Sequence, residues 1–254
     1  MFDFLAITWN VDPELFAIGP FHFRYYGILF MAGFALGYYM FIKFYEREGL
    51  PVTLLDPLFW LLIGCTLVGS RLGHVLFYQP DYYLANPVEI LKVWEGGLAI
   101  YGGIIGGIAA AFIVCKIEKL NFFNLLDMVG MSLLIGQGIG RWGNYANQEA
   151  FGTFTYKNFG MMSDTVIDYI ERHPASFGLE GVSDIPAHIA ENNLHVHPTF
   201  FYESVWCILG FFVLYIILKR YRKFSGQLFL TYGLWYGLER MVVEGMRTDS
   251  LYIG

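Results

Sequence analysis

Apolar residues along the chain are gathered into six long segments, separated by short polar loops and by one long polar interval. Each segment is about as long as the roughly 20 residues that a helix needs to cross a bilayer. The six predicted spans are residues 26–44, 55–78, 98–115, 123–142, 199–218 and 227–246. The interval between the fourth and fifth, residues 153–197, is too polar to cross a membrane. The pattern therefore predicts an all-α, polytopic transmembrane helix bundle with a small head inserted between the fourth and fifth long spans.

Positive charges in the loops predict the orientation of the chain, because Lys and Arg are concentrated in cytoplasmic loops. Eight of them lie at or just after the ends of the first, third and fifth predicted spans: Lys43, Arg47, Lys116, Lys119, Lys219, Arg220, Arg222 and Lys223. The opposite side has four, although it includes the long polar interval. We therefore expect the N-terminus and an extracytoplasmic head to face outward. The predicted organisation is a four-span bundle in residues 1–152, the head in residues 153–197 and a two-span hairpin in residues 198–254.

Composition supports a membrane protein and argues against several functional classes. Of the 254 residues, 56% are hydrophobic and 15% are charged, whereas soluble domains have about 25% charged residues. No basic patch is present, so a nucleic-acid partner is not expected. The three cysteines are dispersed in apolar segments, and the six histidines have no metal-ligand spacing. The sequence therefore predicts neither a metal site nor a cofactor.

The fourth predicted span ends in a polar cluster with the sequence Gly-Arg-Trp-Gly-Asn-Tyr-Ala-Asn-Gln-Glu-Ala-Phe-Gly, residues 140–152. Arg141, Asn144, Asn147 and Glu149 fall within nine residues. Charged groups at membrane depth cost a few kcal/mol or more, and they usually mark function. For Arg141 alone, an arginine at a helix end that extends to the headgroups is the alternative. The density of the cluster favours a functional site.

Other polar residues fall at the same depth when the predicted topology is applied. They come from the other five spans: Tyr26, Arg71, His74, Tyr101, Tyr202, Glu203, Arg240, Glu244 and Arg247. We therefore expect a shared cavity that opens toward the outer leaflet. Arg240 and Glu244 lie four residues apart on one helical face, so a simple ion pair is the alternative for these two. Arginines in excess of such pairs suit a phosphate, and the outer leaflet supplies phosphate as phospholipid headgroups.

Residues 140–149 resemble the signature of bacterial prolipoprotein diacylglyceryl transferases. Similar segments follow the family's order over most of the chain: Tyr-Tyr-Gly at 25–27, Gly-Ser-Arg-Leu-Gly at 69–73, Trp-Glu-Gly-Gly-Leu at 94–98, His-Pro-Thr at 197–199, Tyr202-Glu203, and Tyr236-Gly237 with Arg240, Glu244 and Arg247. The resemblance implies a transferase that moves the diacylglyceryl group of phosphatidylglycerol to the lipobox cysteine in the signal peptide of a preprolipoprotein. A thioether would form and glycerol 1-phosphate would leave. The enzyme would lie in the bacterial inner membrane and take its nucleophile from the protein substrate.

The resemblance also implies roles for individual residues. Arg141 and Arg240 would hold the phosphate and stabilise its charge as it leaves. The lipid would be bound by Arg141, Asn144, Asn147, Glu149, Tyr26 and Arg240, with support from Arg71, His74, Glu203, Glu244 and Arg247. Tyr101 occupies the position where the family often has a histidine that is assigned as the base. Because tyrosine is a poor base at neutral pH, His74 is the alternative to Tyr101.

Two other functional classes fit the same residues. A membrane transporter or channel for an anionic or phosphorylated solute could use the arginines for selectivity, but such proteins often have repeated halves with broken helices, and the sequence shows no such repeat. A scaffold could use the polar cluster only to hold the bundle together. The family usually continues past the position of Gly254 into one more span, so we expect the family's final span to be missing here.

Overall fold

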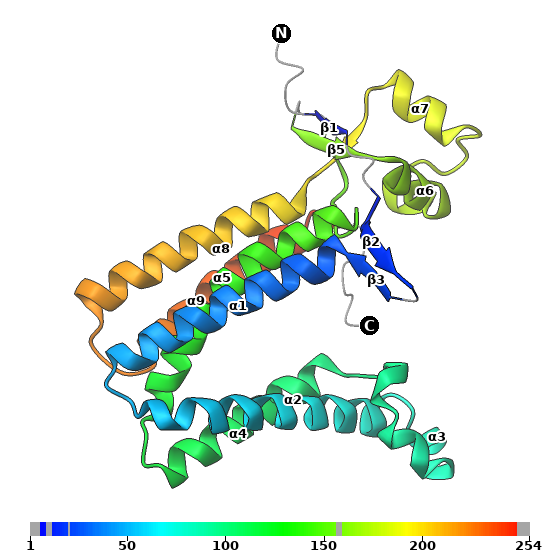
Figure 1. Ribbon diagram of the computed structural model, residues 1–254. Coiled ribbons are helices and arrows are strands. Elements are labelled where there is room, and N and C mark those ends of the chain that lie inside the picture. Colours follow the sequence, from blue (N-terminus) through cyan, green and yellow to red (C-terminus); the bar gives the residue numbers. More distant parts are fainter. Residues whose placement is uncertain (1–5, 9–11, 20, 156–158, 248–254) are drawn as a thin grey trace. The chain divides into compact units, whose positions relative to one another are not determined.

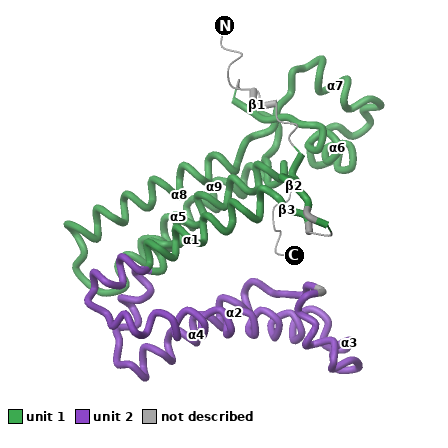
Figure 2. Tube along the Cα trace, in the orientation of Figure 1, with its two compact units in different colours: residues 1–41, 129–254 green, residues 42–128 purple. Residues whose placement is uncertain are grey.

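The computed structural model describes residues 6–8, 12–19, 21–155 and 159–247 of the chain. Most of these residues are helical, as the sequence predicts (Figure 1). The chain divides into two units (Figure 2). Unit 1 is formed by residues 1–41 and 129–254, and unit 2 by residues 42–128. The boundaries between the units fall inside two of the long helices, so the three predicted domains remain a prediction.

Five of the described helices are long and apolar enough to cross a membrane. They are α1 (Tyr25–Arg47), α2 (Leu55–Phe77, preceded by η1, Val52–Leu54), α4 (Ile100–Ile117), α5 (Phe122–Ala146) and α8 (Thr199–Ile216, continued by the π-helical segment η5, Ile217–Tyr221). The first five predicted spans are thereby confirmed as apolar helices. The sixth, α9 (Gln227–Glu244), is also a helix, but its three charged residues make it less apolar than the other five.

The helices of unit 1 approach one another at glycines. A Cβ atom at Gly33 of α1 would lie 3.0 Å from the carbonyl oxygen of Gly136 in α5. A Cβ atom at Gly138 of α5 would lie 3.4 Å from Cβ of Cys207 in α8. Residues without a side chain let membrane helices pack backbone against backbone. The helix α5 is therefore in close contact with both α1 and α8, which brings polar groups from distant parts of the sequence together.

The helices α8 and α9 are joined by a pair of tryptophans. The indole Nε1 of Trp206 donates to the carbonyl oxygen of Trp235 at 3.0 Å, and Nε1 of Trp235 donates to that of Trp206 at 2.9 Å. The two rings stack with their centroids 4.6 Å apart. Gly210 makes room for the ring of Trp235, because a Cβ atom there would overlap the indole. This reciprocal contact fixes the register between the two helices.

The segment between α5 and α8 forms a small folded region of its own. It contains β4 (Phe154–Thr155), β5 (Gly160–Met162), α6 (Asp164–Arg172), η4 (Pro174–Phe177), α7 (Ile185–Glu191) and β6 (His195–Val196). Ser163 and Asp184 cap α6 and α7 by accepting hydrogen bonds from backbone amides. Its apolar core includes the buried side chains of Met161, Val166, Ile170, Ile189 and Val196. The described part of the polar interval predicted as a head thus has secondary structure and an apolar core.

Short strands were not predicted for this region. The four-stranded sheet has the order β1-β5-β6-β4, and its edge strand β1 (Ala6–Thr8) comes from the N-terminus and pairs in parallel with β5. Strands of two or three residues are too short to produce an alternating pattern in the sequence. A second sheet, the antiparallel hairpin of β2 (Glu14–Ile18) and β3 (Phe21–Arg24), leads directly into α1. The all-α prediction therefore describes the long helices but misses these strands.

Unit 2 is organised by the contact between α2 and α4, which are connected through α3 (Pro80–Ala85), η2 (Pro87–Leu91) and η3 (Val93–Glu95). Gly69 and Gly73 of α2 face Gly102 and Gly106 of α4. A Cβ atom at Gly73 would lie 3.0 Å from Cα of Gly102. The two backbones therefore touch, as in other membrane helix pairs with small residues at four-residue spacing.

Replacing Gly102 by alanine is expected to lower the free energy of unfolding by about 1–3 kcal/mol, because overpacking a close contact forces the helices apart. The added Cβ atom would overlap the carbonyl oxygen of Gly69. Gly64→Ala is the matched control, since it adds the same methyl group where nothing lies within 4 Å. Unfolding in mixed micelles, followed by circular dichroism, measures both values. Equal stability of the two variants would show that α2 and α4 do not pack through Gly102.

Candidate functional site

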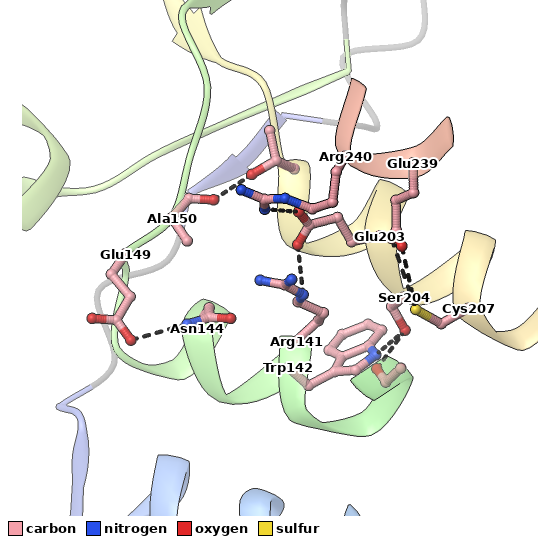
Figure 3. A network of polar contacts seen from close by, with 12 residues as sticks. Arg141, Trp142, Asn144, Glu149, Ala150, Glu203, Ser204, Cys207, Glu239 and Arg240 are labelled. Atoms are coloured by element: carbon pink, nitrogen blue, oxygen red, sulfur yellow. Dashed lines mark hydrogen bonds and ion pairs between the residues drawn. The ribbon is translucent and has the colours of Figure 1, made fainter. Parts of the chain in front are cut away.

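A chain of ion pairs joins α5, α8 and α9 in unit 1 (Figure 3). Arg141 Nε lies 2.6 Å from Glu203 Oε2, and Arg240 Nη1 lies 3.5 Å from Glu203 Oε1. The other terminal nitrogen of Arg240 pairs with Glu244 on the same helix. The Glu203 side chain is 1% exposed, whereas Arg141 and Arg240 are 20% and 28% exposed. A buried carboxylate is thus placed between two arginines that still reach the surface of the unit.

The residues next to the ion pair fix its geometry. Trp142 Nε1 donates to Ser204 Oγ at 3.0 Å, and Ser204 Oγ donates to the carbonyl oxygen of Gly138 at 2.8 Å. Trp142 follows Arg141 in α5, and Ser204 follows Glu203 in α8. The two helices are therefore connected twice at the same level, once by charge and once by neutral hydrogen bonds. This double connection leaves the Arg141 guanidinium little freedom to turn.

Arg141 retains donors that nothing in the described chain uses. Its Nε nitrogen faces Glu203, but neither terminal nitrogen has a hydrogen bond or ion pair among the described residues. Guanidinium groups bind phosphate through such a fork of parallel donors. Because Glu203 holds the inner edge of the group, the free donors have a fixed direction. The arrangement is suited to binding an anion with oxygen ligands.

The loop after α5 is built around Glu149. Asn144 Nδ2 and Asn147 Nδ2 both donate to Glu149 Oε1, at 3.1 Å and 3.2 Å. Gln148 and Ala150 have φ angles of 57° and 56°, which are uncommon for residues with side chains and often mark functional loops. The carboxylate of Glu149 is exposed. The structure thus brings three of the predicted lipid-binding residues into contact with one another.

Further contacts connect this loop to α8 and to the end of α9. The hydroxyl group of Thr199 donates to the carbonyl oxygen of Ala150 (Figure 3). Gly152 pairs with Arg247 in an isolated β-bridge. A Cβ atom at Gly152 would lie 2.7 Å from the carbonyl oxygen of Met246, so this position requires glycine. Arg247, which was predicted to support the site, is therefore joined to the loop through its backbone.

Tyr26 also lies against the end of α5. Its ring covers Gly143, where a Cβ atom would lie 2.7 Å from Tyr26 Cδ2. The first turn of α1 is therefore packed one residue from Asn144. In total, unit 1 contains nine of the predicted site residues: Tyr26, Arg141, Asn144, Asn147, Glu149, Glu203, Arg240, Glu244 and Arg247.

The other three predicted site residues, Arg71, His74 and Tyr101, belong to unit 2. Arg71 is buried and hydrogen-bonded to backbone carbonyl groups. His74 stacks on Tyr78, with ring centroids 5.0 Å apart. Tyr101 is the second residue of α4 and is 79% exposed. A cavity that these residues share with Arg141 stays a prediction.

Sequence reasoning missed the buried pair of Glu239 and Cys207. Cys207 Sγ lies 3.8 Å from both carboxylate oxygens of Glu239, and both side chains are buried. The signal was present in the sequence, because Glu239 is a charged residue within an apolar segment, but its neighbour Arg240 has the more obvious phosphate chemistry. The pair adds a further polar contact between α8 and α9 (Figure 3). Among the described residues, no three His, Cys, Asp or Glu side chains are grouped so that they could hold a metal ion.

Comparison with known proteins assigns the chain to a family. The family model described as prolipoprotein diacylglyceryl transferase matches residues 13–254. Phosphatidylglycerol–prolipoprotein diacylglyceryl transferases from Staphylococcus aureus strains Newman, USA300 and JH9 are each 39% identical to the chain over 252 residues, which cover 98% of the chain and 83% of each relative. Both the match and the identity extend over the helices that build the ion-pair chain and the loop after α5. The chain belongs to the prolipoprotein diacylglyceryl transferase family.

Proposed function

We propose that the chain transfers the diacylglyceryl group of phosphatidylglycerol to the lipobox cysteine of a preprolipoprotein. Family membership supports this activity, and the names of the relatives state both substrates. The observation that carries the proposal is the guanidinium of Arg141, which is anchored by buried Glu203 and has both terminal nitrogens without a partner in the described chain. Such a fork can bind a phosphodiester anion through two parallel hydrogen bonds. A transporter of an anionic solute is not favoured, because the relatives are transferases.

The reaction needs no nucleophile from the enzyme. The sulfur of the substrate cysteine, as thiolate, attacks the glycerol carbon that bears the phosphate ester. A carbon–sulfur bond forms as the carbon–oxygen bond breaks, and the bonding electrons leave with glycerol 1-phosphate. The thiol proton passes to a base. The protein's own contribution is then to orient the lipid, to stabilise the departing phosphate and to accept the proton.

In this proposal the residues of unit 1 orient the lipid and stabilise the departing phosphate. Arg141 and Arg240 contact the phosphate and stabilise the charge that develops on it. Asn144, Asn147 and Glu149 form a polar rim that binds the hydroxyl groups of the headgroup glycerol, and Tyr26 packs beside this rim. Glu203, Glu244 and Arg247 keep the arginines and the loop in position. This division follows the ion pairs and hydrogen bonds between these groups.

Location in the membrane follows from the charge pattern and the substrates. Loops rich in Lys and Arg face the cytoplasm, so the folded region between α5 and α8 is extracytoplasmic. The ion-pair chain lies at the ends of α5 and α8 that adjoin this region. The site therefore opens toward the outer leaflet of the bacterial cell membrane. Phosphatidylglycerol and the lipobox of the preprolipoprotein signal peptide meet at this level.

Transfer is tested directly by incubating the purified protein with phosphatidylglycerol and a lipobox peptide and measuring the diacylglyceryl adduct by mass spectrometry. Arg141→Ala is expected to lower the rate by about 100-fold or more, the usual effect of removing a donor that stabilises transition-state charge. Arg172→Ala is the matched control and should keep the wild-type rate, because Arg172 is exposed on α6. A folded wild-type protein that forms no adduct would contradict the proposed function. Full activity of Arg141→Ala would contradict the role of Arg141.

Glu203→Gln is expected to lower the free energy of unfolding by about 3 kcal/mol, because it removes the buried carboxylate that pairs with two mostly buried arginines. Glu46→Gln is the control, since Glu46 pairs with Lys43 at an exposed position of α1, where loss of a pair costs at most about 1 kcal/mol. Thermal unfolding in detergent measures both. If Glu203→Gln were as stable as Glu46→Gln, Glu203 would not hold the two arginines in place.

The base is tested at two positions. Tyr101→Phe removes the hydroxyl group and is expected to lower the rate of transfer by at least tenfold, because proton transfer by a positioned side chain contributes about 100-fold or more. His74→Ala tests the alternative. Single-turnover rates with saturating lipid measure the chemical step for each variant. If both variants keep full activity, neither residue is the base.

A further inference from the structure

The guanidinium group of Arg71 donates all its hydrogen bonds in the described chain to the backbone of one loop. Arg71 is 6% exposed and lies in α2. Its Nε nitrogen donates to the carbonyl oxygen of Ile90 at 2.8 Å, and Nη2 donates to that of Glu89 at 2.5 Å. Nη1 donates to the carbonyl oxygens of Gly96 and Gly97, at 2.7 Å and 3.0 Å. All three nitrogens are thus in use.

These four acceptors come from both ends of the loop that leads to α4. Two belong to η2 and two follow η3, so Arg71 holds the beginning and the end of this loop around one cation. The ring of Tyr83 lies 5.1 Å from the guanidinium carbon and closes one face of the group. Gly97 has a φ of 71°, and a Cβ atom there would lie 2.5 Å from Arg71 Nη1. The loop can therefore surround the guanidinium only because this position is glycine.

The same part of α2 also holds the first turn of α4. The amide of Ala99 donates to the carbonyl oxygen of Ser70 at 2.9 Å. Gly73 contacts the backbone of Gly102. Tyr101 lies between these two attachments, at the second position of the helix. The position of Tyr101 therefore depends on the loop that Arg71 organises and on the contact between Gly73 and Gly102.

We propose that Arg71 is a positioning residue for the transfer reaction, which acts by holding the loop of residues 89–97 and with it the first turn of α4 that bears Tyr101. The inference rests on the proposed function of Tyr101. It assigns Arg71 no contact with the lipid phosphate. To bind phosphate, Arg71 would have to release part-buried backbone acceptors, which would then lose their hydrogen-bond donor. Lysine cannot replace it, because an ammonium group lacks the planar fork that reaches several acceptors at once.

A double-mutant cycle between Arg71 and Tyr101 tests the proposal. The variants are Arg71→Gln, Arg71→Lys, Tyr101→Phe and the double substitution, assayed with phosphatidylglycerol and a lipobox peptide. Arg71→Gln and Arg71→Lys are each expected to lower kcat at least tenfold and to change the KM for the lipid less than twofold. In the Tyr101→Phe background, Arg71→Gln should lower kcat by no more than threefold further. Wild-type adduct formation, measured in parallel, reports on the proposed function separately.

Three results would overturn the proposal. A rise in lipid KM at constant kcat would make Arg71 a ligand of the headgroup. If the fold losses in kcat of the two single variants multiply in the double variant, Arg71 does not act through Tyr101. If Tyr101→Phe keeps full activity, the Tyr101 hydroxyl group has no role in the reaction that Arg71 could support.

Gly97→Ala provides a second route if Arg71→Gln does not fold. Its Cβ atom would lie 2.5 Å from Arg71 Nη1 and 2.9 Å from the His74 ring. The variant is therefore also measured in the His74→Ala background, where the same loss of kcat is expected while Arg71 itself is intact. Gly49→Ala is the matched control: Gly49 has a similar φ of 68°, but nothing lies within 4 Å of its added Cβ atom. Both variants carry the same backbone strain, and only Gly97→Ala should lose activity. Equal kcat in the two variants would contradict the proposal.

Discussion

The ion pair between Glu203 and Arg141 is the interaction on which the site depends. A carboxylate that is almost fully removed from solvent is tolerated only if its charge is matched and its position is fixed. Here the match comes from two arginines on two other helices. In return, the carboxylate keeps two guanidinium groups from repelling each other and from turning away. The site is therefore assembled by tertiary packing, since none of its three helices contains the whole charge arrangement.

Packing constraints around this pair explain why the helices can come so close. Gly138 allows α8 to approach α5, and Ser204 then uses the backbone carbonyl of Gly138 as an acceptor. On the other side of α8, the reciprocal contact of Trp206 and Trp235 fixes the register of α9. A shift of one residue in either contact would rotate Glu203 or Arg240 by about 100° around its helix axis. Small residues and tryptophans thus determine where the charges meet.

The sequence was sufficient for some of these features and insufficient for others. The long spans could be predicted because span length and apolarity are local properties, and the cluster after α5 because its polar density is local too. The partner of Arg141 could not be derived from spacing, since Glu203 is 62 residues away and is selected only by the packing of α5 on α8. The strands of the folded region after α5 could not be predicted either, because β1 pairs with residues about 150 positions later in the chain. Nothing in the sequence near Glu239 identifies its partner, Cys207 on the facing helix.

Arg71 and Arg141 show why an arginine within an apolar helix does not by itself indicate a substrate site. Both are charged groups in long apolar helices, and the sequence treats them alike. The donors of Arg71 are occupied by four carbonyl oxygens that are its neighbours in the fold. Arg141 has one edge held by a carboxylate and the other edge without a partner in the described chain. A guanidinium that is fully hydrogen-bonded gains little from a phosphate, whereas one that is anchored on a single edge is oriented and still able to bind. The unused donors of a fixed arginine, more than its charge, therefore support the proposed contact between Arg141 and the lipid phosphate.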